Sequence, residues 1–344
     1  MKINWLLQLC LYMTCVCAQG QNDVFKVFKI WDQAGHNAFT DLIKFGGKYY
    51  CTFREGGGHV PWPSGIDGKI RILESEDGEE WKSAALLEKY DYDLRDSKLS
   101  VDAQGRLMVL MGGSNYNNET HLLINRLTHV SFYDKKSNTF SAPEPVNIDP
   151  VIKTEYDWLW RVTWHKRIGY GVVYSKKDKS ESDLSLVKTL NGTDYELVAR
   201  LPMEGVAGEA SVTFNEDDHM IILVRVDSEP RIGRIAKSRY PYTDWKWEET
   251  GLRLGGPNII PFRDDWYLIG TRSFNFKSQA KTSIYLYRKG EEIRNVVELP
   301  SGGDNSYPGL LLEGKQLWVS YYSSHEGKAS IYMAKIPLSY IRIF

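Results

Sequence analysis

The sequence predicts an all-β protein: one six-bladed β-propeller of four-stranded antiparallel blades. One pattern recurs six times along the 344 residues, each time as an apolar stretch, a tight polar turn and a second apolar stretch. The apolar stretches are short and rich in Val, Ile, Tyr and Trp, which is typical of strands. No segment keeps a helical period, and repeats of about 50 residues that hold several strands are typical of propellers.

The polar turns give the register of the repeat. Taking one turn residue as the anchor of each copy, successive anchors are 58, 62, 51, 47 and 49 residues apart: Gly47, Gly105, Arg167, Asp218, Asp265 and Gly314. Residues 22–32 read as one strand before the first repeat, and residues 329–336 as one near the end. We expect these two strands to share a blade and close the ring, because closure removes exposed sheet edges.

The N-terminus predicts export. Lys2 precedes an apolar run over 5–16, and Val16-Cys17-Ala18 offers the small residues that signal peptidases cleave after, so residues 1–18 read as a signal peptide and 22–344 as one propeller domain. The run is too short for a membrane span. We therefore expect a secreted or periplasmic protein, with a surface lipoprotein anchored at Cys15 or Cys17 as the alternative. Cleavage would leave Cys51 as the single thiol, which we expect in the core.

Composition narrows the possible partners. The formal net charge is −1 and both signs are mixed along the chain, which argues against nucleic-acid or anionic-membrane partners. The seven histidines show no metal-ligand spacing, and neither an HExxH pattern nor a cysteine cluster occurs. We therefore expect a monomer that needs no metal or cofactor.

One repeat carries a recognisable turn, Ser-Glu-Asp-Gly-Glu-Glu-Trp over 75–81, and a degenerate relative, TLNGTDY, stands at 189–195. Ser and Asp side chains can bond backbone groups inside such a turn, and Gly allows a positive φ. The motif resembles the Asp box (BNR repeat) of the sialidase, or neuraminidase, superfamily of six-bladed propellers. In that family the Asp box lies on outer turns, so we assign it a structural role.

Arginine recurs at one point of the repeat. Seven residues after the anchors stand Arg54, Gly112, Tyr174, Arg225, Arg272 and Tyr321. Three arginines converging on the propeller axis would make a clamp for a carboxylate. The alternative is that each arginine pairs with a structural Asp or Glu of a neighbouring blade.

The first strand of each repeat presents polar and aromatic residues, a mixture that sugar sites use. Seven residues before the anchors stand Thr40, Lys98, Trp160, Ser211, Asn258 and Tyr307, and nine before stand Ala38, Asp96, Trp158, Glu209, Gly256 and Asn305. Glu209 with Arg225 sixteen residues later resembles the Glu-to-Arg blade of sialidases, and Tyr307 resembles their nucleophile. The resemblance implies that Tyr307 attacks the anomeric carbon while Glu209 takes its proton. A phenol, with a pKa of about 10, needs such help, and sialidases are an exception to the two-carboxylate rule.

The resemblance also implies an acid/base aspartate in the loop after the second strand, where Asp67 stands; His59 in the same loop is the rival proton carrier. One departure is clear: the family's Arg-Ile-Pro is replaced by His36-Asn37-Ala38. Arg54 or Arg95 would then supply the missing arginine. The complete expected substrate-binding set is Arg54, Arg225, Arg272, His36, Asn37, Arg95, Asp96, Trp160, Arg161, Asn258 and Asn305.

These features predict a divergent exo-glycosidase that releases a terminal acidic, sialic-acid-like sugar from glycans. One alternative is a propeller rhamnosidase or polysaccharide lyase acting on uronate-containing glycans, with His36, His59 or His121 as the proton carrier. The other is a propeller that binds glycans on tryptophans, without turnover.

Overall fold

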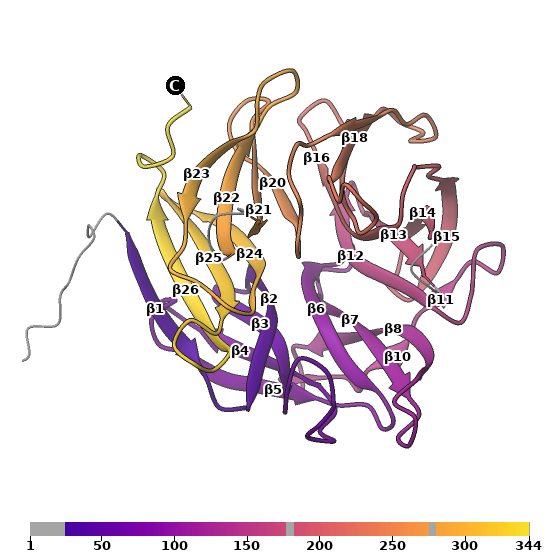
Figure 1. Cartoon of the computed structure of the whole chain (residues 1–344), viewed down its shortest axis with the longest axis vertical. Coiled ribbons are helices and arrows are strands. Elements are labelled where there is room, and N and C mark those ends of the chain that lie inside the picture. Colours follow the sequence, from indigo (N-terminus) through magenta and orange to yellow (C-terminus); the bar gives the residue numbers. More distant parts are fainter. Residues whose placement is uncertain (1–24, 177–181, 275–279, 344) are drawn as a thin grey trace, which may run out of the picture.

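The computed structural model describes residues 25–176, 182–274 and 280–343, and every regular element among them is a strand or an isolated bridge. The strands form six blades arranged in a ring, as Figure 1 shows. The predicted six-bladed β-propeller is therefore confirmed. The predicted signal peptide and its cysteines lie outside the described residues. Within those residues, no helix has the length and apolar character needed to cross a membrane.

In most blades the strands follow chain order from the axis outward. The first blade consists of β2 (His36–Phe45), β3 (Lys48–Gly56), β4 (Lys69–Ser75) and β5 (Lys82–Leu87). The second consists of β6 (Asp93–Val101), β7 (Leu107–Tyr116), β8 (Leu123–Asp134) and β10 (Glu144–Pro145), and β9 (Thr139–Phe140) also pairs with β8. The third consists of β12 (Asp157–His165), β13 (Ile168–Ser175), β14 (Asp183–Thr189) and β15 (Asp194–Arg200), and β11 (Asn147–Ile148) pairs with β15 in parallel. The fourth and fifth are β16 (Ala207–Phe214), β17 (Met220–Val226), β18 (Arg234–Ser238) and β19 (Trp247–Glu249); and β20 (Asn258–Pro261), β21 (Tyr267–Ser273), β22 (Lys281–Tyr287) and β23 (Arg294–Glu298).

The sixth blade joins the two ends of the chain. It consists of β24 (Asn305–Glu313), β25 (Gln316–Ser323), β26 (Ser330–Pro337) and, on the outside, β1 (Lys26–Trp31) from the N-terminal side. β1 and β26 pair antiparallel. The predicted ring closure is confirmed, since the first and last strands share one sheet.

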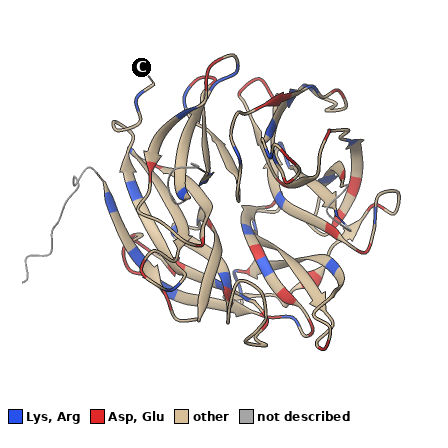
Figure 2. Cartoon of the chain, viewed as in Figure 1, with Lys and Arg blue, Asp and Glu red and all other residues tan. Residues whose placement is uncertain are grey.

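The repeat anchors lie where the pattern placed them, in the turns between the first and second strands. Five of the six have a positive φ, and in the fifth blade the neighbouring Asp264 takes it instead of Asp265. Basic and acidic residues are interspersed along the strands and loops around the ring (Figure 2). Cys51 is buried and unpaired, as predicted.

The apolar core is divided among the six boundaries between blades. Each hydrophobic cluster draws on two neighbouring blades; Ile72 and Leu107 meet between the first and second, and Phe53 and Trp318 between the sixth and first. A blade therefore buries its apolar faces only when both neighbours are present, as in other repeat proteins.

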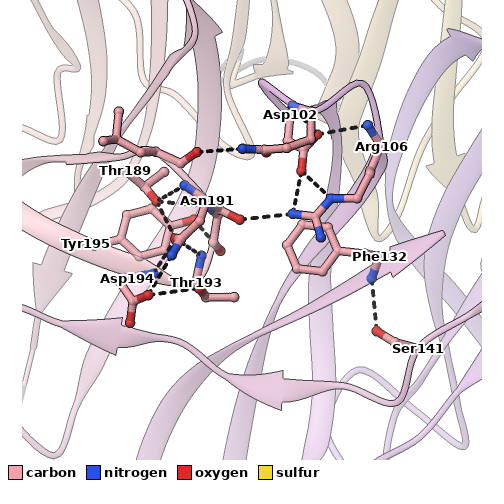
Figure 3. A network of polar contacts seen from close by, with 12 residues as sticks. Asp102, Arg106, Phe132, Ser141, Thr189, Asn191, Thr193, Asp194 and Tyr195 are labelled. Carbon is pink, nitrogen blue, oxygen red and sulfur yellow. Dashed lines mark hydrogen bonds and ion pairs between the residues drawn. The ribbon is translucent and has the colours of Figure 1, made fainter. Parts of the chain in front are cut away.

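Two outer turns fasten one blade to the next. In the turn between β14 and β15, Thr189 accepts a hydrogen bond from the backbone N–H of Gly192, and Asn191 from those of Thr193 and Asp194 (Figure 3). Arg106 of the second blade donates to the carbonyl of Asn191 at 3.2 Å while its guanidinium lies 4.0 Å from the Phe132 ring. The turn thus joins the third blade to the second.

The turn between β4 and β5 joins the first blade to the sixth, where the ring closes. Asp77 accepts hydrogen bonds from the backbone N–H groups of Glu79 and Glu80 at 2.8 and 3.0 Å, as the residues of this turn predicted. Glu79 then pairs with Lys335 of β26 at 2.6 Å. A Cβ on Gly78, whose φ is +70°, would lie 2.0 Å from the Trp318 ring. Glycine is therefore required for the turn to reach the sixth blade.

We predict that Gly78→Ala destabilises the protein more than Gly47→Ala. Both glycines have positive φ, but a Cβ on Gly47 would have no neighbour within 4 Å. Gly47→Ala should cost about 1–2 kcal/mol for backbone strain alone, and Gly78→Ala about 1–3 kcal/mol more for the clash. Urea unfolding followed by tryptophan fluorescence measures both. Equal losses would show that the turn does not need this close contact.

Candidate active site

A pocket of about 560 Å³ opens near the propeller axis, where the second, third, fourth and sixth blades meet. Five residues of the predicted catalytic and substrate-binding sets line it: Arg95, Asp96, Glu209, Arg225 and Tyr307. Trp158, from the same position of the repeat as Asp96 and Glu209 and one of the tryptophans of the glycan-binding alternative, lines it as well. The structure thus brings together the predicted nucleophile, its carboxylate partner and two of the predicted arginines.

Bulges in the inner strands direct these side chains. Five of the six inner strands contain a bulge in which two residues oppose one on the second strand. Phe39, Asp96 and Tyr307 occupy the first bulge position of their strands with φ of 68°, 53° and 51°. Positive φ at such residues costs about 1–3 kcal/mol each and concentrates at functional sites. The equivalent strain in three blades therefore makes this end of the axis the candidate for the functional site.

Tyr307 and Glu209 form the central contact. The Tyr307 hydroxyl donates a hydrogen bond to Glu209 Oε1, and Arg225 Nη1 lies 3.1 Å from the same oxygen. The backbone N–H of Gly256 donates to Glu209 Oε2 at 2.9 Å. A Cβ on Gly256 would lie 2.5 Å from the Tyr307 ring, so glycine there allows the ring to approach.

This environment keeps the phenol protonated until a base acts. Burial, with the added charge of Glu209, raises the pKa of Tyr307 well above its usual value. The neighbouring carboxylate of Glu209 raises the pKa of Arg225, which stays charged. Tyr307 could therefore act as a nucleophile only if its proton were transferred, and Glu209 is hydrogen-bonded to that proton.

Asp96 and Lys98 add a second titratable pair. Burial raises the pKa of Asp96 to about 6; the charge of Lys98 opposes this rise and that of Glu209 adds to it. Burial also lowers the pKa of Lys98 to about 8. The Lys98 ammonium lies 4.8 Å from the Trp160 ring and 5.4 Å from that of Tyr307. Asp96 can thus hold a proton up to about pH 6 and release it above that pH, which is the range in which a general acid can work.

The cations of the pocket differ in how they are paired. Arg225 contacts Asp227 at 2.8 Å, and Lys176 contacts the other oxygen of Asp227 at 2.9 Å. Arg95 pairs with the buried Asp93. Among the described residues Arg126 has no carboxylate partner and its buried Nε has no hydrogen bond, while its guanidinium lies 5.5 Å from the Trp158 ring. Arg126 is therefore the cation most available to an anionic ligand.

Three other predicted arginines lie outside the pocket lining. The guanidinium of Arg54 is fully buried against Asp93, and its Nη1 donates to the carbonyl of Gly58 at 2.7 Å. Arg161 makes a two-bonded ion pair with the buried Asp41 at 3.0 and 3.1 Å. Arg272 lies beside the Phe274 ring at 4.8 Å. Arg54 thus follows the structural-pairing alternative for its strand position, and Arg161, on an inner strand, is paired in the same way.

Four other predicted ligands have structural contacts. Asn37, Asn258 and Asn305 are buried and donate to backbone carbonyls. Trp160 is buried beneath Tyr307, with ring centroids 6.1 Å apart. None of the four lines the pocket.

The remaining predicted residues lie at the rim. Asp67 lines a neighbouring pocket of about 460 Å³ that shares Tyr116 with the axial pocket. Burial and the charge of Asp93 raise the pKa of Asp67. His36 and His59 both contact Asp304, at 2.9 and 2.8 Å, and do not line the axial pocket.

Sequence reasoning missed several lining residues: Ser114, Tyr116, Arg126, Tyr174, Lys176, Gly208 and Asp227. A signal for two of them was present. Lys176 and Asp227 stand two residues after Tyr174 and Arg225, and alternate residues of a strand share a face. Arg126 lies in β8, a third strand, which the search along first and second strands did not reach.

No protein-family model matches the sequence, and no curated protein sequence matches it. Solved structures share the fold. A protein of unknown function from Dyadobacter fermentans is 17% identical, with a TM-score of 0.75 over 92% of this chain and 100% of its own. Trypanosoma rangeli sialidase in complex with the inhibitor DANA is 13% identical, with a TM-score of 0.67 over 88% of this chain and 55% of the sialidase. The α-L-arabinofuranosidase Arb93A from Fusarium graminearum is 12% identical, with a TM-score of 0.66 over 92% of this chain and 99% of its own.

The chain has a sialidase-like propeller fold. It spans about half the length of the trypanosomal sialidase, and the arabinofuranosidase shares the same architecture over nearly its whole length. Identities this low establish the fold alone, so the chemistry rests on the pocket.

We predict that Asp96→Asn stabilises the fold increasingly as pH rises. The folded-state pKa of about 6 exceeds the ordinary value near 3.9, so ionisation of Asp96 weakens the fold between these pH values. The substitution should change stability little at pH 4 and raise the free energy of unfolding by about 2–3 kcal/mol at pH 7.5. Urea unfolding at both pH values measures this. A difference that does not grow with pH would contradict the raised pKa.

Proposed function

We propose that the protein is an exported glycosidase that removes a terminal acidic sugar by way of a tyrosine nucleophile. The hydrogen bond from Tyr307 to Glu209, open to a pocket near the axis, carries this proposal. In the first step Tyr307 attacks the anomeric carbon, its proton passes to Glu209, and the glycosidic bond breaks. In the second step water displaces the tyrosine, which recovers its proton from Glu209.

Asp96 is the best placed acid for the leaving group. It lines the same pocket as Tyr307 and Glu209, and its pKa of about 6 lets it hold a proton and give it up. In the second step its carboxylate takes a proton from the attacking water. Asp67, the residue implied by the family resemblance, lines the rim pocket instead.

The charges of the pocket favour an anionic sugar. Arg126 faces it without a carboxylate partner among the described residues, and Arg225 and Lys176 stand opposite Asp227. A guanidinium forms paired hydrogen bonds with a carboxylate, so a sugar acid is the ligand that this lining would bind best. A phenol also approaches an anionic sugar with less repulsion than a carboxylate nucleophile does.

The structural neighbours support a glycosidase. The sialidase and the arabinofuranosidase are glycoside hydrolases by name. The N-terminal sequence supports export, because residues 1–18 have the pattern of a signal peptide.

We predict that Tyr307→Phe abolishes sugar release. The assay is mass detection of monosaccharides released from a panel of sialylated, ketodeoxy-sugar-capped, rhamnose–glucuronate and neutral glycans. Release should fall at least about 10³-fold, since the variant keeps the ring and loses the attacking oxygen. Tyr332→Phe removes a buried hydroxyl of β26, which lies two strands out from β24, and Tyr332 does not line the axial pocket. It is the matched control and should keep full activity.

Release that survives in Tyr307→Phe would refute the tyrosine nucleophile and favour a histidine-based rhamnosidase or lyase. Release of neutral sugars alone would refute the acidic substrate. Binding of a glycan with no release by the wild type would indicate a non-catalytic propeller.

We predict that Asp96→Asn lowers kcat by an amount that depends on the leaving group of the substrate, whereas Asp67→Asn has little effect on kcat with any leaving group. If Asp96 protonates the leaving oxygen, Asp96→Asn should lower kcat about 10²–10⁴-fold on a natural glycan. It should lower kcat much less on an aryl glycoside, whose leaving group needs no proton. Asp67→Asn should stay close to wild type on both. The reverse pattern would transfer the acid role to Asp67.

A further inference from the structure

Two histidines and one aspartate from distant parts of the chain meet beside the axial pocket. His36 begins β2, His59 lies in the loop between β3 and β4, and Asp304 directly precedes β24. His36 Nε2 and His59 Nδ1 lie 2.9 and 2.8 Å from the same oxygen, Asp304 Oδ2. The three atoms all lie within 4.8 Å of one another.

We propose that His36, His59 and Asp304 form a binding site for one divalent transition-metal ion of the zinc type. The proposal is independent of the glycosidase function. Zinc binds imidazole nitrogen and carboxylate oxygen at about 2.0–2.2 Å. Ligand atoms on a tetrahedral ion with these bond lengths are about 3.4 Å apart, so the two contacts at Asp304, now 2.9 and 2.8 Å, would need to lengthen by only about half an ångström to admit the ion. Two nitrogen donors favour this class of ion over calcium or magnesium, which prefer oxygen.

The carboxylate is held in position by neighbouring groups. The Tyr322 hydroxyl donates to Asp304 Oδ1 at 2.8 Å and leaves Oδ2 to the histidines. The backbone N–H of Asp304 donates to Ser324 Oγ at 2.9 Å. Outer contacts of this kind orient metal ligands and are worth about 10–100-fold in affinity.

The two histidines differ in exposure. The His36 side chain is 11% exposed and packs between Phe39 and Tyr322, whereas that of His59 is 54% exposed. Closed structural zinc sites use four protein ligands. The three found among the described residues would leave positions for water or for an oxygen of a bound glycan.

The site lies next to the axial pocket but is separate from it. The Phe39 ring is 5.1 Å from the His59 ring on one side and 4.8 Å from the Tyr307 ring on the other. An ion here would therefore be screened from Tyr307 by an aromatic ring, and its binding can be tested without reference to sugar release.

The competing interpretation is a purely hydrogen-bonded cluster, in which both imidazole N–H groups donate to Asp304. That arrangement needs no ion and predicts no zinc affinity beyond that of scattered surface groups.

Isothermal titration of the chelator-treated full chain with zinc chloride distinguishes the two. The wild type should bind one zinc ion that His59→Ala loses, with affinity falling at least about 100-fold. Tyr322→Phe keeps the ring, removes the hydroxyl that orients Asp304, and should weaken binding about 10–100-fold. His121→Ala is the matched control, because His121 is an exposed rim histidine that stacks on Trp62 away from this cluster. Cys10, Cys15 and Cys17 are present in every variant, so any zinc that they bind is common to all.

Tyr307→Phe should bind zinc as the wild type does, so a failed glycosidase proposal leaves this test intact. An anomalous zinc signal between the three side chains in a soaked crystal would confirm the ligands. A wild type that binds no zinc at millimolar concentration, or a His59→Ala variant that binds as tightly as the wild type, would overturn the proposal.

Discussion

Apolar contact between neighbouring blades is the constraint on which the rest of the structure depends. Each hydrophobic cluster belongs to a boundary between two blades, so the six boundaries are complete only when the ring is closed. β1 supplies the outer strand of the sixth blade, and the turn carrying Gly78 reaches Trp318 across the same boundary. The ring is therefore closed in two ways, by backbone pairing of β1 with β26 and by contact of the outer Gly78 turn with the sixth blade. An outer turn of the third blade contacts the second blade in a similar way, through the hydrogen bond from Arg106 to the carbonyl of Asn191.

Closing the ring brings the inner strands together, and a buried ion pair and hydrogen bonds then link these strands near the axis. Asp41 of β2 accepts two hydrogen bonds from Arg161 of β12 and one from the backbone N–H of Leu99 in β6. One buried carboxylate thus ties three blades together beneath the pocket. Buried pairs contribute little net stability but are costly to break singly, so this contact serves position more than energy. Lys98 lies beside it and supports the ring of Tyr307 from below.

The sequence predicted the fold well because turn chemistry and strand alternation are local properties. The anchors predicted the turns of all six blades, and Tyr307, Glu209 and Arg225 followed from equivalent strand positions together with the family resemblance. The predicted carboxylate clamp of Arg54, Arg225 and Arg272 does not form, since only Arg225 of the three lines the pocket. Whether an arginine at this strand position faces a ligand or pairs with a carboxylate depends on the neighbouring blade. Arg54 meets Asp93 in β6, a contact that no spacing within β3 reveals. The cluster of His36, His59 and Asp304 joins residues up to 268 positions apart, so only the closed ring brings it together.

The end of the axis that carries the pocket is where the backbone conformation departs most from regular strand geometry. Phe39, Asp96 and Tyr307 hold positive φ values at the bulges of their strands, and Asp96 is a carboxyl whose ionisation burial disfavours. Each feature lowers stability, and the long-range blade contacts that surround them are able to hold them in place. A flexible loop would relax such strain, whereas the inner strand of a closed propeller is held on both sides. The architecture thus explains how Asp96 and Tyr307 can keep this backbone conformation on bulged inner strands.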